Sequence, residues 1–397
     1  MSDSFALREV YPRSERERRT LGDFLERHGL RYEEDIEYAV GAYDENDALI
    51  ACGCCSGRVL KCFAVNEEAR GRNLLGSILS RLSTWQFQRG NTRLLVFTKP
   101  ENGVFFQQSG FFVVAATPRA MLLENLNNGF SRFAEKSLSP GDAHTPSGAV
   151  VMNCNPFTLG HRHLIEYAAA RCPVLHIFLV EEDRSIFPFH VRKRLLREGT
   201  ADIPNVRIHD SGPYMISAAT FPTYFLKSVD EATDVCAELD ITIFACGIAP
   251  PFSIRRRFAG EEPYCELTEK YNAAMRRILP DYGIALEIIP RLRAGGHTVS
   301  ASIVRKILRE SGPCASLHCL VPESTRLFLE GEEAAAILAK LRNNGDARCE
   351  PFLSAETAAQ DNQGGKMHVG AEKKRYCRDA GIQRYSSHHC SQSRQGD

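Results

Sequence analysis

The feature that most constrains the fold is an alternation of apolar and amphipathic runs between residues 149 and 309. Short apolar runs predict strands at 149–152, 174–180, 206–209, 241–245 and 284–290. Runs with apolar residues on one helical face predict helices at 164–170, 191–197, 229–239, 273–279 and 303–309. Because such an alternation needs a parallel sheet with both faces covered, we predict a Rossmann-like α/β domain over residues 145–342.

The preceding residues follow a different pattern. After a short helix at 21–27, strands are predicted at 37–43, 48–55 and 58–65, with turn pairs between them. A helix at 74–87, a strand at 93–98, a short helix at 102–109 and a strand at 110–116 follow. We therefore predict a separate α+β domain over residues 1–140, and the loop formers between 137 and 147 mark its end.

Composition limits the partners and the compartment. Lys and Arg total 49 and Asp and Glu total 49, so we expect neither a nucleic acid nor a membrane as partner. No apolar run is long enough to span a membrane and the first residues do not resemble a leader, so we expect a cytoplasmic protein. The 14 cysteines lack the paired spacing of zinc sites, and we predict no metal-binding cluster.

The last 55 residues, 343–397, differ from the rest. From Leu, Ile, Val and Phe they contain only Phe352, Leu353, Val369 and Ile382. So few large apolar side chains cannot build a core, and we expect this tail to be disordered.

The strongest chemical signal follows the strand at 149–152. Asn153, Asn155 and Phe157 lead into a helix that begins with Gly160 and His161. A helix start that contains glycine lets an anion approach the backbone amides, and Thr158 projects from the same turn as His161. The segment predicts an anion site at a helix N-terminus.

A second signal opens the helix at 303–309. Ser300 and Ser302 are candidate caps of that helix. Arg305 lies one turn further on, where a guanidinium can hold two phosphate oxygens at once. Two phosphate-binding signals at opposite ends of one α/β domain favour a nucleotide ligand.

These two segments resemble the signatures of the adenylyl- and cytidylyltransferase superfamily. The resemblance implies ATP and Mg²⁺ as cofactors, with Thr158, His161 and Arg305 as catalytic residues. In it, Thr158 and His161 stabilise the α-phosphate, and the second segment holds the departing pyrophosphate with Mg²⁺. The implied nucleotide-binding residues are Asn153, Asn155, Phe157, Gly160, Ser300, Ser302 and Arg305.

The first domain resembles the acyl-CoA-dependent N-acetyltransferase fold. The resemblance rests on the strand that ends at Val65, the loop Arg70-Gly71-Arg72-Asn73 before the helix at 74–87, and residues 99–111. It implies that Arg70, Gly71, Arg72 and Asn73 contact the pyrophosphate of a coenzyme A group. Asn73 and Leu75 stand where that family has smaller residues, so a domain that keeps the fold without transferring acyl groups is equally open.

A narrower resemblance covers residues 20–330. Segments 152–162, 182–188, 219–227, 262–265, 271–275 and 289–291 together are similar to the citrate (pro-3S)-lyase ligase family. The resemblance implies an AMP- and pyrophosphate-forming acid–thiol ligase that converts acetate to acetyl-adenylate. Its partner is the acyl-carrier subunit of citrate lyase, whose coenzyme A-like prosthetic group carries the acetylated thiol. Arg184 and Lys227 are further candidate site residues because of their positive charge. The first domain is expected to bind the prosthetic arm.

Other interpretations remain open. The chain can be a nucleotidyltransferase that acts on a small phosphorylated acceptor, which leaves a stable nucleotide conjugate where the ligase releases AMP. It can also be an N-acetyltransferase with a nucleotide-binding domain, which needs no ATP. Cys154 is either an acyl relay or a thiol that packs under the loop.

Overall fold

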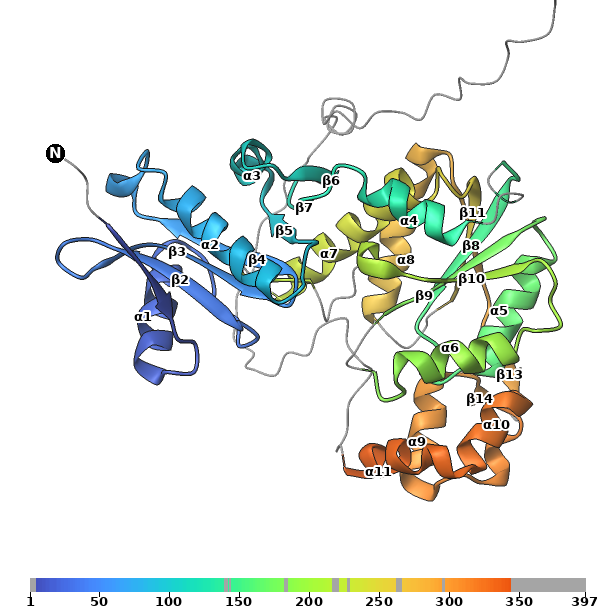
Figure 1. Ribbon diagram of the computed structural model, residues 1–397. Coiled ribbons are helices and arrows are strands. Elements are labelled where there is room, and N and C mark those ends of the chain that lie inside the picture. The colour runs from blue at the N-terminus through green and yellow to red at the C-terminus, as the bar shows by residue number, and fades with distance from the viewer. Residues whose placement is uncertain are drawn as a thin grey trace, which may run out of the picture. The chain divides into compact units, whose positions relative to one another are not determined.

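The computed structural model describes residues 5–138, 142, 144–181, 185–215, 221–226, 229–261, 266–294 and 297–343, shown in Figure 1. The strands of the first sheet are β1 (Ala6–Val10), β2 (Tyr38–Tyr43), β3 (Leu49–Ser56), β4 (Val59–Val65), β5 (Leu95–Thr98), β6 (Phe112–Ala116) and β7 (Met121–Glu124). The helices around it are α1 (Glu15–Arg27), α2 (Leu74–Gln88), α3 (Gly103–Gln108) and α4 (Gly129–Ser137).

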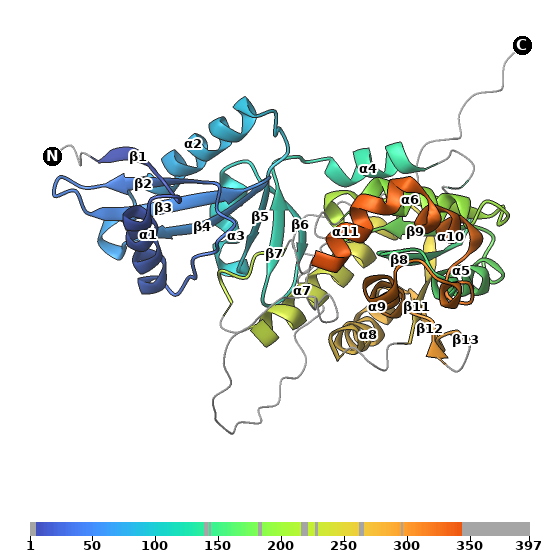
Figure 2. The same cartoon turned by 90° about the horizontal axis from the view of Figure 1, so that it is seen from below.

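The first sheet has the strand order β1-β2-β3-β4-β5-β7-β6. Only β4 and β5 run parallel, and every other neighbouring pair is antiparallel. Figures 1 and 2 show α1 on one face of the sheet and α2 on the other. Leu21 and Phe24 of α1 belong to the core on its face, and Ile78 and Leu82 of α2 belong to the core on the opposite face. This is the acetyltransferase-like α+β fold that the sequence predicts.

The parallel strands β4 and β5 separate after two residue pairs. Val59 lies beside Leu95 and Leu60 beside Val96, and no later pair joins the strands. Because β4 continues to Val65, its second half forms no ladder with β5. The sheet therefore contains an opening between two neighbouring parallel strands.

The second sheet consists of β8 (Ser147–Met152), β9 (Leu175–Leu179), β10 (Val206–Asp210), β11 (Ile254–Gly260) and β12 (Ala285–Ile289). Its order is β10-β9-β8-β11-β12 and all its strands are parallel. The helices are α5 (Leu159–Ala169), α6 (Phe189–Glu198), α7 (Val229–Ile243), α8 (Glu266–Ile278), α9 (Ala301–Ser311), α10 (Glu323–Glu330) and α11 (Ala335–Asn343). A short hairpin, β13 (Arg293–Ala294) and β14 (His297–Thr298), precedes α9.

Side chains of this sheet alternate between two cores. Val150 and Met152 of β8 point to the core that holds α5 and α6, whereas Ala149 belongs to the core that holds α7 and α8. Helices α9, α10 and α11 complete the α6 side, where Figure 1 shows them together below α6. Helices therefore cover both faces, which confirms the predicted Rossmann-like parallel sheet.

One predicted strand is wrong. Residues 241–245 continue helix α7 to Ile243 and then form a π-helical turn, Phe244–Ile248. Helix α7 packs against α8 and against β6 of the first sheet, and residues 239–245 at its end are all buried. A short apolar run that is buried on every side has no periodicity that separates strand from helix. The strand of this region is β11, whose run of Arg255, Arg256 and Arg257 concealed it.

Other elements begin elsewhere or were not predicted. Helices α1, α5 and α8 start several residues earlier than expected, and β1, β7, α4 and α10 had no predicted counterpart. The described residues all fall in one compact unit, so the boundary between residues 140 and 145 stays a prediction. The predicted tail lies outside the described residues beyond Asn343.

Candidate active site

The first signature segment joins β8 to α5. Strand β8 is the central strand of the second sheet. The next strands in the chain, β9 and β10, lie on one side of it, and the later strands β11 and β12 lie on the other. Ligands of open parallel sheets bind beside the carboxyl ends of the strands at such a reversal of strand order. Residues 153–161 follow the carboxyl end of β8 and therefore occupy this position.

Thr158 and His161 form a capping box at the start of α5. The Thr158 hydroxyl accepts a hydrogen bond from the His161 backbone N–H at 3.4 Å. In return, the Thr158 backbone N–H donates to His161 Nδ1 at 3.0 Å. The side chain of Thr158 is 1% exposed, so it positions the imidazole more than it presents a surface to a ligand.

The same hydrogen bonds define the state of His161. Burial, and then the positive charges of Arg291 and Arg305, lower the pKa of His161 to about 4. The imidazole is therefore neutral at pH 7 and carries one proton. Because Nδ1 accepts from the Thr158 N–H, that proton lies on Nε2, which makes Nε2 a hydrogen-bond donor. A neutral donor of this kind can stabilise charge that develops on a phosphate.

The structure brings the second signature segment against the first. A Cβ on Gly160 would lie 2.8 Å from the backbone oxygen of Val299, the residue before Ser300. The glycine therefore permits close approach of the two segments. Across the same contact, Arg305 Nη1 donates to the backbone oxygen of Asn155 at 2.6 Å.

The hydroxyls of the second segment lie at the start of α9. Ser300 caps this helix by accepting from the Ile303 N–H at 3.2 Å, as predicted. Ser302 is exposed in the first turn, 3.5 Å from Arg305 Nη2. The N-termini of α5 and α9 thus present polar donors to one edge of the sheet.

Asn153, Asn155 and Phe157 lie inside the loop. Asn153 bonds to Ser185 at 3.2 Å, and the Asn155 side chain accepts from the backbone N–H of Phe187 at 3.0 Å. The ring of Phe157 is fully buried and stacks on the imidazole of His161, with centroids 5.9 Å apart. Their roles as nucleotide ligands stay predictions, and their visible contacts support the loop.

Two arginines that the sequence analysis did not select are central to the site. Arg192 of α6 is fully buried and donates to the backbone oxygens of Asn153 and Phe187 at 2.7 and 3.0 Å, which fixes the loop. Arg291 follows β12, contacts the backbone oxygen of Glu261 at 2.7 Å, and acts electrostatically on His161. The signal for Arg291 was its position just after a strand of the parallel sheet.

Three further candidates have different outcomes. Cys154 is fully buried, and this burial strongly raises the pKa of its thiol, which therefore stays protonated. This agrees with a packing residue and not with a nucleophile. Arg184 and Lys227 lie outside the described residues.

The loop predicted to bind a coenzyme A group lies at the start of α2. Arg70, Gly71, Arg72 and Asn73 are all exposed, and Arg70 pairs with Glu67 at 3.5 Å. Asn73 adopts a left-handed conformation with φ of 54°. Binding of coenzyme A phosphates by this loop stays a prediction.

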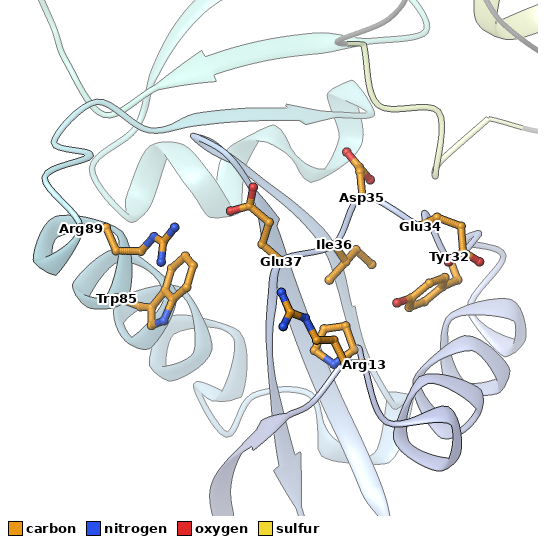
Figure 3. Close-up of a pocket in the computed structure, with 9 residues that line it drawn as sticks. Arg13, Tyr32, Glu34, Asp35, Ile36, Glu37, Trp85 and Arg89 are labelled. Atoms are coloured by element: carbon orange, nitrogen blue, oxygen red, sulfur yellow. The ribbon is translucent and has the colours of Figure 1, made fainter. Parts of the chain in front are cut away.

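A cavity of about 510 Å³ lies in the first part of the chain. Figure 3 shows Trp85 and Arg89 of α2 on one side of it and Tyr32 and Glu34 on the other. None of the predicted site residues lines this cavity, and its wall carries Glu34, Asp35 and Glu37. Because these three carboxylates outnumber Arg13 and Arg89 on the same wall, the cavity does not favour phosphate, and we do not assign the nucleotide to it.

Among the described residues there is no group of three or more His, Cys, Asp or Glu side chains that could hold a metal ion. In the same part of the chain, no helix is long and apolar enough to cross a membrane.

The fold and the site define a class of protein: an acetyltransferase-like sheet followed by a Rossmann-like domain with two facing helix starts of phosphate-binding character. Residues 147–329 match the family described as citrate lyase ligase C-terminal domain. A citrate (pro-3S)-lyase ligase of Klebsiella pneumoniae is 38% identical over 317 residues, which cover 79% of this chain and 92% of the relative. The ligase of Escherichia coli K12 is 38% identical over 319 residues, covering 78% and 89%. The chain belongs to the citrate (pro-3S)-lyase ligase family.

Solved structures each resemble about 30% of the chain. An acyl-CoA N-acyltransferase from Pseudomonas aeruginosa is 12% identical, with a TM-score of 0.26, and the match covers 31% of this chain and 99% of that one. A GNAT-family acetyltransferase from Staphylococcus aureus is 10% identical, with a TM-score of 0.27, covering 30% and 98%. These scores are too low to carry an argument, and the fold assignment rests on the strand order.

Proposed function

We propose that this chain is an ATP-dependent ligase that activates citrate lyase by acetylating its acyl-carrier subunit. The reaction uses acetate and ATP, releases pyrophosphate and then AMP, and leaves an acetyl thioester on the coenzyme A-like prosthetic group. The observation that carries the proposal is the meeting of the two signature segments, where Gly160 lies against Val299 and Arg305 reaches Asn155. Family membership supports citrate lyase as the target.

In the first half-reaction, an acetate oxygen attacks the α-phosphorus of ATP and the bond to the pyrophosphate breaks. Negative charge rises on the α-phosphate oxygens, and the enzyme needs positioned donors more than a covalent group. His161 donates from Nε2, and Thr158 holds the ring in that orientation. Arg305 and Arg291 supply positive charge on the same side of the sheet, where they already lower the pKa of His161.

Pyrophosphate leaves toward the start of α9. Ser300 caps this helix, and Ser302 and Arg305 lie in its first turns. The substrate phosphates, held by Ser300, Ser302 and Arg305, would carry Mg²⁺, since Mg²⁺ in proteins is commonly bound through substrate phosphates and water. The metal neutralises phosphate charge when it is bound.

In the second half-reaction, the thiol of the prosthetic arm attacks the acetyl carbon of acetyl-adenylate and AMP leaves. The nucleophile belongs to the partner, so no cysteine of this chain is needed, in agreement with the buried Cys154. Residues 70–73 remain our candidates for contacts with the phosphates of the arm. Since ATP and acetate are metabolites of the cytoplasm, we also propose that the protein works there.

The direct test is recovery of citrate lyase activity. Deacetylated citrate lyase is incubated with the full chain, ATP, Mg²⁺ and acetate, and lyase activity, AMP and pyrophosphate are measured. We expect activity to return only when all components are present. His161→Ala and Arg305→Ala should each lower the rate by roughly 100-fold or more, because each removes a donor to developing charge.

Matched substitutions separate chemistry from folding. Lys306→Ala removes an exposed cation next to Arg305, and His318→Ala removes an exposed histidine, so both should retain the wild-type rate. A stable nucleotide conjugate in place of AMP would favour the nucleotidyltransferase interpretation. Acetyl transfer from acetyl-coenzyme A to an amine without ATP would favour the acetyltransferase interpretation.

A further inference from the structure

The opening between β4 and β5 exposes backbone groups that a regular sheet would pair. The ladder between the strands ends at Leu60 and Val96, and the next residue of β5 is Phe97. On β4, Cys62 has a left-handed φ of 58°, which turns this part of the strand out of regular pairing. A carbonyl and an amide at this depth need hydrogen-bond partners from elsewhere.

A tyrosine from a distant part of the chain provides a partner for the carbonyl. The Tyr224 hydroxyl donates to the backbone oxygen of Phe97 at 2.7 Å. Cys62 of β4 belongs to the same buried core as Tyr224 and Phe97. Tyr224 is only 4% exposed and belongs to the core on the α1 side of the sheet. Its hydroxyl therefore provides a partner for a β5 carbonyl just beyond the point where the ladder with β4 ends.

The residues beside Tyr224 are anchored to the same sheet. The ring of Phe221 packs edge-on against Phe97, with centroids 5.6 Å apart. Thr223 donates from its backbone N–H and its hydroxyl to Glu33 Oε1, at 2.6 and 3.0 Å. The second oxygen of Glu33 pairs with Lys61 of β4 at 2.9 Å. Residues 221–226 thus contact the strands at the opening in three ways. Tyr224 bonds to Phe97, Phe221 packs on the Phe97 ring, and Thr223 bonds to Glu33, which pairs with Lys61.

The other end of the opening also departs from a coenzyme A site. At the start of α2, a Cβ on Gly76 would collide with the side-chain amide of Asn73. The Asn73 side chain therefore lies over the first turn of the helix, so phosphates of the proposed prosthetic arm would contact the exposed side chains of this loop and not the amides of that turn. The residues present do not fit an acyl-coenzyme A group that lies between β4 and β5.

We propose that segment 221–226 is the permanent occupant of the opening between β4 and β5. In this arrangement the first domain does not hold an acyl thioester between these strands and does not act as an acetyltransferase. The first domain instead binds residues 221–226, which follow β10 of the second sheet. This proposal does not depend on the ligase reaction, because it concerns an intramolecular contact.

Hydrogen–deuterium exchange of the full chain tests the proposal without ATP, acetate or citrate lyase. Tyr224→Phe removes only the hydroxyl, so amides around Cys62 in β4 should exchange about fivefold faster or more. Tyr43→Phe, on β2 and outside the opening, should leave β4 unchanged. Millimolar acetyl-coenzyme A should not slow exchange in β4 or β5 of the wild-type protein, whatever it does elsewhere.

Two results would overturn the proposal. The first is unchanged exchange of β4 in a folded Tyr224→Phe variant, which would mean that the hydroxyl does not close the opening. The second is slower exchange of both β4 and β5 when acetyl-coenzyme A is added to the wild-type protein. This second measurement needs no variant, so it stands even if the substitution impairs folding.

Discussion

At the scale of single residues, the neighbours of His161 determine the pKa of its imidazole. Burial, Arg291 and Arg305 hold its pKa at about 4. Arg291→Gln removes one of the two positive charges, so the pKa of His161 should rise by about half a pH unit or more. NMR titration of the imidazole signals measures this value directly. Arg293→Gln, an exposed arginine on the nearby hairpin, is the matched control and should leave the titration unchanged.

A wild-type His161 that titrates near pH 6.5 would contradict this account of the site. It would mean that the imidazole is solvated and that Nε2 is not a fixed donor at neutral pH.

A buried pair of histidines makes the free energy of unfolding depend on pH. His176 Nδ1 and His209 Nε2 are 2.9 Å apart, and burial lowers their pKa values to about 4 and about 3. The unfolded chain binds protons below pH 6.5 that the folded chain does not. The free energy of unfolding should therefore fall by roughly 1 to 3 kcal/mol between pH 6.5 and 5. Urea unfolding at several pH values measures this slope.

The nearest charges to this pair are those of Asp142 and Arg207, which bond to each other at 2.8 Å. His209→Gln should flatten the slope because one titrating group is lost, whereas the exposed His318→Gln should not. An equal slope in the wild-type and His209→Gln proteins would show that other groups cause the acid sensitivity.

At the scale of elements, the site depends on how closely α5 and α9 approach. Gly160→Ala places a methyl group 2.8 Å from the backbone oxygen of Val299, and a backbone atom cannot move aside cheaply. We expect a loss of about 1 to 3 kcal/mol in the free energy of unfolding and weaker ATP binding. Gly260→Ala, at the end of β11, meets no atom within 4 Å and should change stability little.

Denaturant unfolding and calorimetric titration with ATP measure the two effects of Gly160→Ala. If this variant binds ATP as the wild type does, the close contact between the segments is not needed for the nucleotide.

At the scale of the whole molecule, one core connects the two sheets. It includes Leu21 and Phe24 of α1 together with residues of α7 and α8. Tyr214, just after β10, donates to the buried Glu124 of β7 at 3.0 Å. We therefore expect the described part of the chain to unfold in a single calorimetric transition.

Tyr214→Phe tests this connection. It leaves Glu124 with Arg93 at 2.6 Å but removes the hydroxyl partner, so stability should fall by about 1 to 2 kcal/mol in that same transition. Two separate transitions in the wild-type protein would instead show that the sheets unfold independently.

Local patterns were enough to predict the order of most elements and the residues at both signature helices. The caps at Thr158 and Ser300 depend on residues within three positions of each other, so a local pattern reveals them. The same reasoning failed at Ile241 and at Arg257, because packing on several sides decided helix at one and strand at the other. Arg291 was missed for a related reason, since its importance comes from a distant histidine.

The sequence by itself therefore determined the two fold classes and the chemistry available at the two helix starts. Tertiary structure decided which groups meet. It placed Gly160 against Val299, two arginines beside His161, and the Tyr224 hydroxyl on the backbone oxygen of Phe97 in β5. The physical reason is that hydrophobic periodicity and capping act over a few residues. Charge coupling and the filling of an open strand edge depend on residues that are far apart in the chain.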